Sequence, residues 1–88
     1  MPTISRFYGI VIQMYVSEDE QHRPHFHALY GEYAASIDIA TGELLAGKLP
    51  KRAARLVRDW ARQHRPELRA NWDRVRNGEL PSAIEPLE

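Results

Sequence analysis

The chain has 88 residues, no cysteine and a formal net charge of zero, with 12 basic and 12 acidic residues. This length predicts a single small domain over residues 1–88, and the lack of cysteine excludes disulfides, thiolate zinc sites and cysteine nucleophiles. The N-terminal sequence lacks the basic start and cleavage site of a signal peptide, and its apolar run is too short to cross a bilayer. We therefore expect a cytoplasmic protein with no membrane association.

The charges are divided unevenly along the chain. The segment from Lys48 to Arg76 has ten basic and three acidic residues, whereas residues 1–47 have two basic and six acidic ones. Residues 77–88 add three glutamates. This asymmetry indicates an anionic partner for the basic segment.

The first half of the sequence predicts short strands over about residues 4–47. The stretch FYGIVIQMY is rich in β-branched and aromatic residues and reads as one strand. The stretches HFHALY and YAASIDI are separated only by Gly31 and Glu32. A glycine in that position is typical of a two-residue hairpin turn. A further turn leads into the short apolar segment ELLAG, so we expect an antiparallel sheet of three to four strands.

The second half predicts two helices over about residues 50–77. Pro50 suits the start of the first helix and Pro66 the start of the second, while Gly78 marks a stop. Apolar residues recur at helical spacing in both segments. The fold class is therefore α+β, with a two-helix hairpin packed on one face of the sheet and an extended tail over residues 78–88.

A turn at Gly31 and Glu32 also predicts where the histidines of RPHFHALYGEY lie. It pairs His25 with Asp38 and His27 with Ser36, on the sheet face away from the main core. Directly opposed side chains are about 5 Å apart at Cβ. A carboxylate at that position would fix the tautomer of the imidazole and raise its basicity.

These residues are open to more than one interpretation. His22, His25 and His27 offer three nitrogen ligands for a divalent transition metal such as zinc. Alternatively, His25 and His27 act as base and acid of a metal-independent nuclease, with Asp38 in support. The ordinary alternative is a polar sheet face whose histidines only form hydrogen bonds. The sequence leaves open whether the protein is an enzyme and whether it binds a metal.

Two further polar residues fall on the apolar stripes of the predicted helices. His64 and Asn71 would be partly buried and must find hydrogen-bond partners. A structural role places those partners across the helical hairpin or at the Arg65-Pro66 junction. A functional role would bring His64 towards the sheet histidines, which the predicted register opposes.

The first helix also carries a row of basic residues opposite its apolar stripe, and the row continues past Pro66. Its members are Lys51, Arg55, Arg58, Arg62, Arg65 and Arg69. Arginine rows suit phosphate or carboxylate recognition, although a solvated face is the ordinary alternative. Nucleic acid, an acidic protein surface or the acidic tail of the chain itself would each neutralise this row.

Several stretches of the chain together carry a family resemblance. They are MPTISRFYGIVIQMY, PHFHA and IDIATGELLAGKLP, followed by Trp60, His64, Glu67-Leu68 and Asn71-Trp72. These stretches resemble a widespread bacterial family, domain of unknown function 4160. Family members are small stand-alone proteins, often encoded beside a second small protein. The resemblance implies a protein partner, as in toxin–antitoxin-like pairs, and a bacterial cytoplasm. It carries over no active site. Members often have Asp-His ahead of PHFHA, whereas here Gln21 precedes His22.

Three functions follow from these features. We favour a protein-interaction module that uses its basic helix or an open sheet edge to bind a small protein or a second copy of itself. A histidine-based site is the second hypothesis. Nucleic-acid binding through the arginine row is the third.

Overall fold

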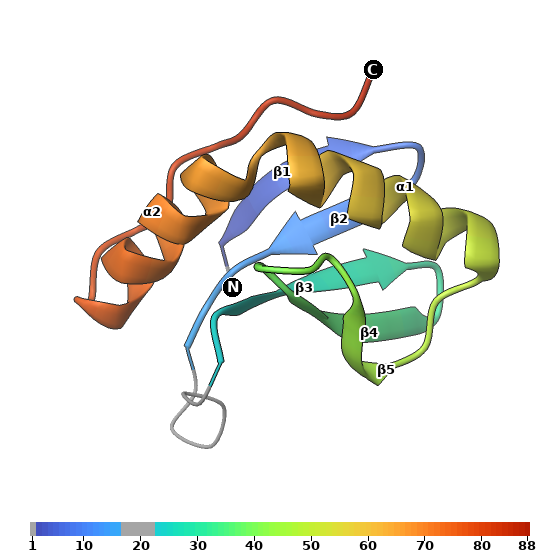
Figure 1. Ribbon diagram of the computed structural model, residues 1–88, viewed down its shortest axis with the longest axis horizontal. Coiled ribbons are helices and arrows are strands. Elements are labelled where there is room, and N and C mark those ends of the chain that lie inside the picture. Colours follow the sequence, from blue (N-terminus) through green and yellow to red (C-terminus); the bar gives the residue numbers. More distant parts are fainter. Residues whose placement is uncertain (1, 17–22) are drawn as a thin grey trace.

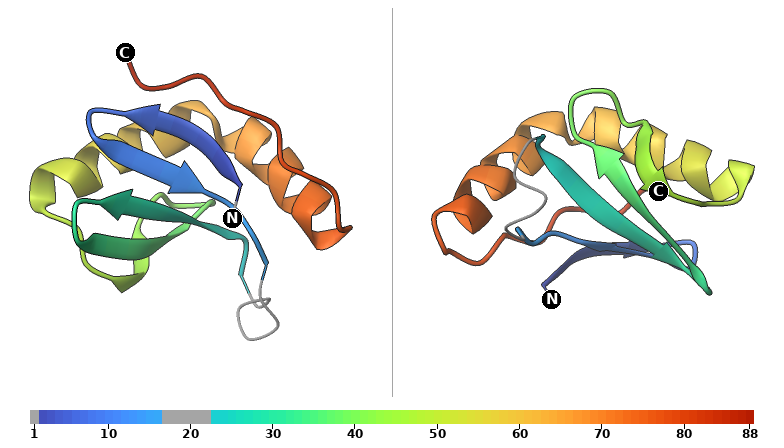
Figure 2. Two further views of the ribbon diagram at one scale, coloured as in Figure 1. Left: turned by 180° about the vertical axis from the view of Figure 1, so that it is seen from behind. Right: turned by 90° about the horizontal axis from the view of Figure 1, so that it is seen from below.

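The computed structural model describes residues 2–16 and 23–88, which form an α+β fold with a five-stranded antiparallel sheet followed by two helices (Figure 1). The strands lie in chain order across the sheet: β1 (Thr3–Phe7), β2 (Ile10–Gln13), β3 (His25–Tyr30), β4 (Tyr33–Asp38) and β5 (Leu44–Gly47). Helices α1 (Lys51–Gln63) and α2 (Arg65–Arg76) cover one face of this curved sheet (Figure 2). Neither helix of the described residues is long and apolar enough to cross a membrane.

The expected count of three to four strands is wrong because the N-terminal apolar stretch forms two strands. A tight turn at Tyr8 and Gly9, with φ angles of 51° and 82°, separates β1 from β2. Two successive positive φ angles are what a type I′ hairpin turn requires. Tyrosine rarely adopts this conformation, so the sequence lacks the usual Asn-Gly signal for the turn.

The predicted hairpin between β3 and β4 is confirmed. Gly31 has a φ of 57° in the connecting turn, and Tyr30 pairs with Tyr33. His25 accordingly lies opposite Asp38. The register inferred from one glycine is therefore the register of the whole hairpin.

The two helices do not form the expected hairpin. One residue, His64, separates α1 from α2, and Figure 1 shows the helices following each other along a bent line. Pro66 lies in the first turn of α2, where its missing N–H and fixed φ are tolerated. A new helix can therefore begin directly after the bend, and both helices remain on the same face of the sheet.

The core lies between the sheet and the helices, with Trp60 at its centre. Trp60 is fully buried, and its ring centroid lies 5.4 Å from that of Phe7 and 5.6 Å from that of Phe26. The predicted apolar stripe of α1 is buried at Ala53 and Val57 as well. These contacts fix α1 across the strands and leave its opposite side exposed.

The C-terminal tail runs along the fold without helix or strand structure and contacts the sheet and α1. The backbone N–H of Ile84 donates to the carbonyl of Ile4 on the outer edge of β1, over 2.8 Å. The indole Nε1 of Trp60 donates to the carbonyl of Glu85, also over 2.8 Å. The Ile84 side chain is only 6% exposed. The tail thus occupies one edge of the sheet.

Candidate functional sites

The histidines of β3 lie side by side, with His25 buried and His27 partly buried. The ring centroids of His25 and His27 are 5.1 Å apart in an edge-on arrangement. Tyr15 stacks on His27, with centroids 4.2 Å apart and ring planes 4° apart. His25 is only 4% exposed, and its ring lies 5.0 Å from that of Trp72. The expectation that His25 faces away from the core is wrong because α2 continues past the bend and brings Trp72 over it.

The orientation of the His25 ring is fixed by the backbone. Its Nδ1 lies 2.8 Å from the carbonyl oxygen of Arg23. A carbonyl oxygen can only accept a hydrogen bond, so Nδ1 must donate it, and a neutral ring then carries its lone pair on Nε2. This arrangement is common behind metal-binding and general-base histidines, but here the orienting group is not the predicted carboxylate.

The carboxylate of Asp38 turns instead towards an arginine and a turn. It accepts hydrogen bonds of 2.8 Å from Nη2 of Arg23 and from the backbone N–H of Ala40. Asp38 is 3% exposed, whereas the Arg23 side chain is 63% exposed. The shared register of His25 and Asp38 therefore does not produce the predicted pairing of imidazole and carboxylate. Asp38 secures the start of β3 to the end of β4.

The described residues do not complete a metal site. His22, the third candidate ligand, lies outside them. Within residues 2–16 and 23–88, no three histidine, aspartate or glutamate side chains gather closely enough to hold a metal ion. Roles for His25 and His27 as ligands, or as base and acid, stay predictions.

His64 and Asn71 have structural partners. Nδ1 of His64 lies 2.7 Å from Oε1 of Glu67 in the first turn of α2, and the His64 ring is 5.6 Å from that of Trp60. Asn71 donates to the carbonyl of Ser82 and accepts from its N–H, each over 2.8 Å. Both residues have the hydrogen-bond partners that a structural role requires, but these partners are the start of α2 and the tail rather than a facing helix.

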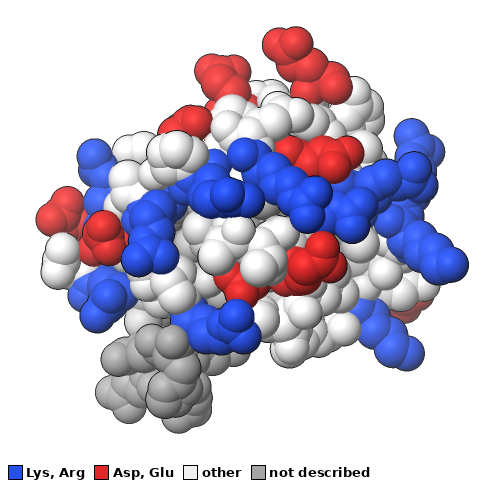
Figure 3. Space-filling model, in the orientation of Figure 1, with Lys and Arg blue, Asp and Glu red and all other residues white. Residues whose placement is uncertain are grey.

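The solvent side of α1 carries the predicted row of basic residues. We call this row the basic face; it consists of Lys51, Arg55, Arg58 and Arg62. The Arg58 side chain is 37% exposed and that of Arg62 is 54% exposed. Figure 3 shows Lys and Arg side chains gathered in a band that follows the helix layer. Arg65 and Arg69, both exposed, continue the basic surface onto α2.

The tail does not neutralise the basic face; the loop before β5 does so only weakly. Oε1 of Glu43 lies 3.7 Å from Nη1 of Arg58 and 4.0 Å from Nη2 of Arg62. Exposed ion pairs of this kind contribute about 0–1 kcal/mol. In the described part of the chain, no ion pair joins the basic face to a glutamate of the tail.

A hollow adjoins the basic face where this loop meets α1. It has a volume of about 280 Å³ and is lined by Gly42, Glu43, Leu44, Lys51, Ala54, Arg55 and Arg58. A Cβ atom at Gly42 would lie 3.1 Å from Cγ of Arg58, so a glycine is what allows this close approach. Leu44 and Leu45 of β5 are 36% and 38% exposed. Sequence reasoning missed this combination, although two adjacent leucines in a short edge strand were a usable signal.

Comparison with known proteins gives one match. A family model described as Domain of unknown function (DUF4160) matches residues 9–73, which include β2 to β5, both histidines of β3 and the basic face. No curated protein matches the chain. No solved structure matches it either.

Proposed function

The chain belongs to the family described as Domain of unknown function (DUF4160), and we propose that it is a protein-interaction module that binds an acidic segment of a partner protein along the basic face. In this proposal the chain acts in the bacterial cytoplasm as one member of a two-protein pair of the toxin–antitoxin kind. The observation that carries the proposal is the basic face with exposed leucines beside it.

The electrostatic support comes from the shortage of nearby acid. The basic face places four cationic side chains on one side of α1, and Asp59 is the acidic residue within that helix. Like charges three or four residues apart on a helix repel each other. A bound carboxylate-rich segment would relieve that repulsion, and arginine offers a planar fork of donors that matches a carboxylate.

The spacing of the basic face suits an extended segment. Successive members are separated by four, three and four residues, which correspond to rises of about 6, 4.5 and 6 Å along the helix. Side chains on the same side of an extended chain are about 7 Å apart. Arginine and lysine side chains are long and flexible enough to take up the difference, so alternate residues of a partner segment can each meet one cation.

The leucines favour protein over nucleic acid as the partner. Leu44 lines the hollow beside the basic face, and Leu45 is exposed next to it in the chain. Protein interfaces combine an apolar centre with polar surroundings. Interfaces with nucleic acid are more polar and much more positively charged.

The test uses a fluorescent peptide as the acidic partner. The probe peptide has about twelve residues, long enough to span the basic face when extended, and alternates acidic residues with serine around a central leucine. Binding is followed by fluorescence anisotropy at low and high salt. Reversing two charges of the basic face, Arg55→Glu with Arg62→Glu, should weaken binding about tenfold, which corresponds to about 1.4 kcal/mol. The matched control, Arg6→Glu with Arg74→Glu, changes the net charge equally at exposed positions elsewhere.

Two outcomes would contradict the proposal. Equal losses in the two double variants would show a response to net charge and not to the basic face. DNA oligonucleotides of similar length that bind more tightly than the peptide, with a steep salt dependence, would assign the basic face to nucleic acid.

A further inference from the structure

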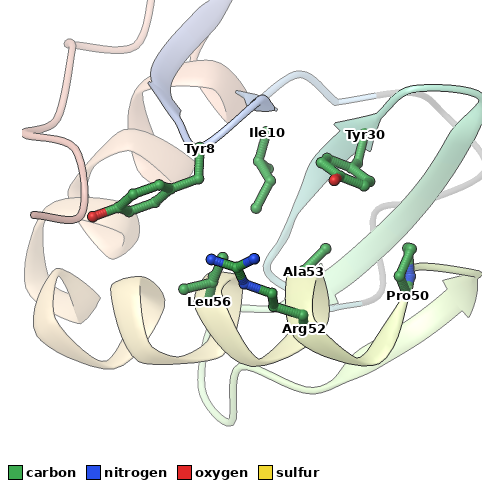
Figure 4. Close-up of a pocket in the computed structure, with 7 residues that line it drawn as sticks. All are labelled: Tyr8, Ile10, Tyr30, Pro50, Arg52, Ala53 and Leu56. Carbon is green, nitrogen blue, oxygen red and sulfur yellow. The ribbon is translucent and has the colours of Figure 1, made fainter.

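A second recess lies on the flank of α1, between the start of that helix and the β1–β2 turn. We call it the Tyr8 pocket; it has a volume of about 190 Å³ and is lined by Tyr8, Ile10, Tyr30, Pro50, Arg52, Ala53 and Leu56. Figure 4 shows side chains from the sheet facing side chains from the beginning of α1 across this space. The pocket is separate from both the histidine pair and the hollow beside β5.

The backbone at Tyr8 is the unusual feature of this pocket. Tyr8 has a φ of 51° and is the non-glycine residue with positive φ among the residues that the structure describes. This conformation is unfavourable for a bulky side chain, and strained positions of this kind cluster at functional sites. The turn would form more readily with Asn at this position. The strained turn instead holds a tyrosine that is 55% exposed at the edge of the pocket.

The second tyrosine is held in place by the same turn. A Cβ atom at Gly9 would lie 3.4 Å from Cε1 of Tyr30, so the ring of Tyr30 packs closely against the glycine. Ile10 and Ala53, at 1% and 4% exposure, supply the buried apolar part of the lining. The pocket therefore combines an apolar floor with two aromatic walls, a composition that suits an apolar side chain.

Charge at the pocket is positive. Arg52 contributes a guanidinium, which Figure 4 shows turned towards the pocket from the first turn of α1. That turn contains no acidic residue, and no side chain caps it. The unpaired N–H groups of a helix start add partial positive charge beside Arg52. A carboxylate next to the bound apolar side chain is therefore favoured.

We infer that the Tyr8 pocket holds one apolar side chain of the acidic partner segment, with an adjacent carboxylate of that segment at Arg52; this rests on the proposed function. Ligand sites for whole small molecules measure about 300–1,000 Å³, and this pocket is smaller. Its size suits a single anchoring side chain, such as those that dominate the energetics of protein interfaces. On a helix with about 100° per residue, Arg52 lies about 90° around α1 from the basic face, so one segment can reach both.

The experiment compares the probe peptide with a version that has alanine in place of its central leucine. The leucine peptide should bind about tenfold more tightly to the unmodified protein, as expected for burial of one side chain. Tyr8→Asn should abolish this preference while raising the midpoint of thermal unfolding, because Asn tolerates the positive φ. Arg52→Gln should weaken binding of both peptides. Leu80→Asn removes a side chain that is 77% exposed elsewhere and should change neither preference nor affinity.

A smaller probe tests the pocket without the basic face. N-acetyl-leucine, which has one apolar side chain and one carboxylate, should shift the amide resonances of Tyr8, Tyr30 and Arg52 in ¹⁵N-resolved NMR spectra. N-acetyl-alanine should shift them far less. Equal affinity for the leucine and alanine peptides, or a Tyr8→Asn protein that keeps the preference, would overturn the pocket and leave the basic face standing. If Arg55→Glu with Arg62→Glu leaves the affinity of both peptides unchanged while the leucine preference still depends on Tyr8, the pocket is supported and the proposed function is overturned.

Discussion

The attachment of the tail through Asn71 provides a quantitative test of the fold. Asn71 is 2% exposed, and its side-chain amide makes two hydrogen bonds of 2.8 Å with the backbone of Ser82. Asn71→Ala removes both bonds. Each typically contributes about 0.5–1.5 kcal/mol net, so we expect the variant to lose about 2 kcal/mol of unfolding free energy.

The loss should exceed that figure if the tail detaches. Ile84 would then leave the core, and burial of an isoleucine side chain contributes about 1.5–3 kcal/mol. For a domain of this size, 1 kcal/mol corresponds to about 4–8 °C in the midpoint of thermal unfolding. Asn71→Ala should therefore lower that midpoint by about 10 °C or more, measured by circular dichroism.

Two substitutions at Ser82 distinguish the contribution of its backbone hydrogen bonds from that of its side chain. Ser82→Ala keeps the backbone donor and acceptor, so it should leave stability unchanged. Ser82→Pro removes the N–H that donates to Asn71, so it should cost roughly half as much as Asn71→Ala. If Asn71→Ala stays within about 0.5 kcal/mol of the unmodified protein, the range of ordinary surface changes, the tail is not held as described.

Four other substitutions test the sheet and the histidine pair. Asp38→Ala should cost about 2 kcal/mol by chemical denaturation, because it leaves an arginine and a backbone N–H without their buried acceptor. Gly47→Ala should prevent pairing of β5 with β4, because the new Cβ would collide with the backbone of β4. Gly31→Asn should fold normally, because a Cβ at that position meets nothing within 4 Å. Amide hydrogen exchange of β5 checks both expectations. His25→Ala should lower the free energy of unfolding by about 2 kcal/mol in thermal melts without metal, because packing against Trp72 is lost. If added zinc widens the difference in stability between the unmodified protein and this variant, His25 has a metal role.

The features that were predicted correctly depend on residues close together in the sequence. The β3–β4 register follows from Gly31 and the alternation around it, and the buried stripe of α1 follows from helical spacing. The turn at Tyr8 was missed because a tyrosine occupies a position that normally has Asn or Gly. The bend at His64 was read as a hairpin because proline marks a helix start without specifying the direction of the helix.

Features that depend on distant residues could not be predicted. The row of basic residues is visible in the sequence, but the leucines beside it depend on how the loop before β5 packs against α1. The Tyr8 pocket unites residues 8, 30 and 52, which no sequence pattern connects. Likewise, the sequence predicts that Asn71 needs hydrogen-bond partners, but it does not predict that these partners lie in the tail, eleven residues away.

The most direct test of the proposed function is a residue-resolved map of peptide binding. The probe peptide is titrated into ¹⁵N-labelled protein, and amide shifts are followed along the chain. We predict that the largest shifts run along α1 from Lys51 to Arg62 and into Leu44 and Leu45, and that they shrink as salt is raised. Shifts centred on His27 and the sheet face around it, with α1 unchanged, would contradict the proposal that the basic face is the binding surface.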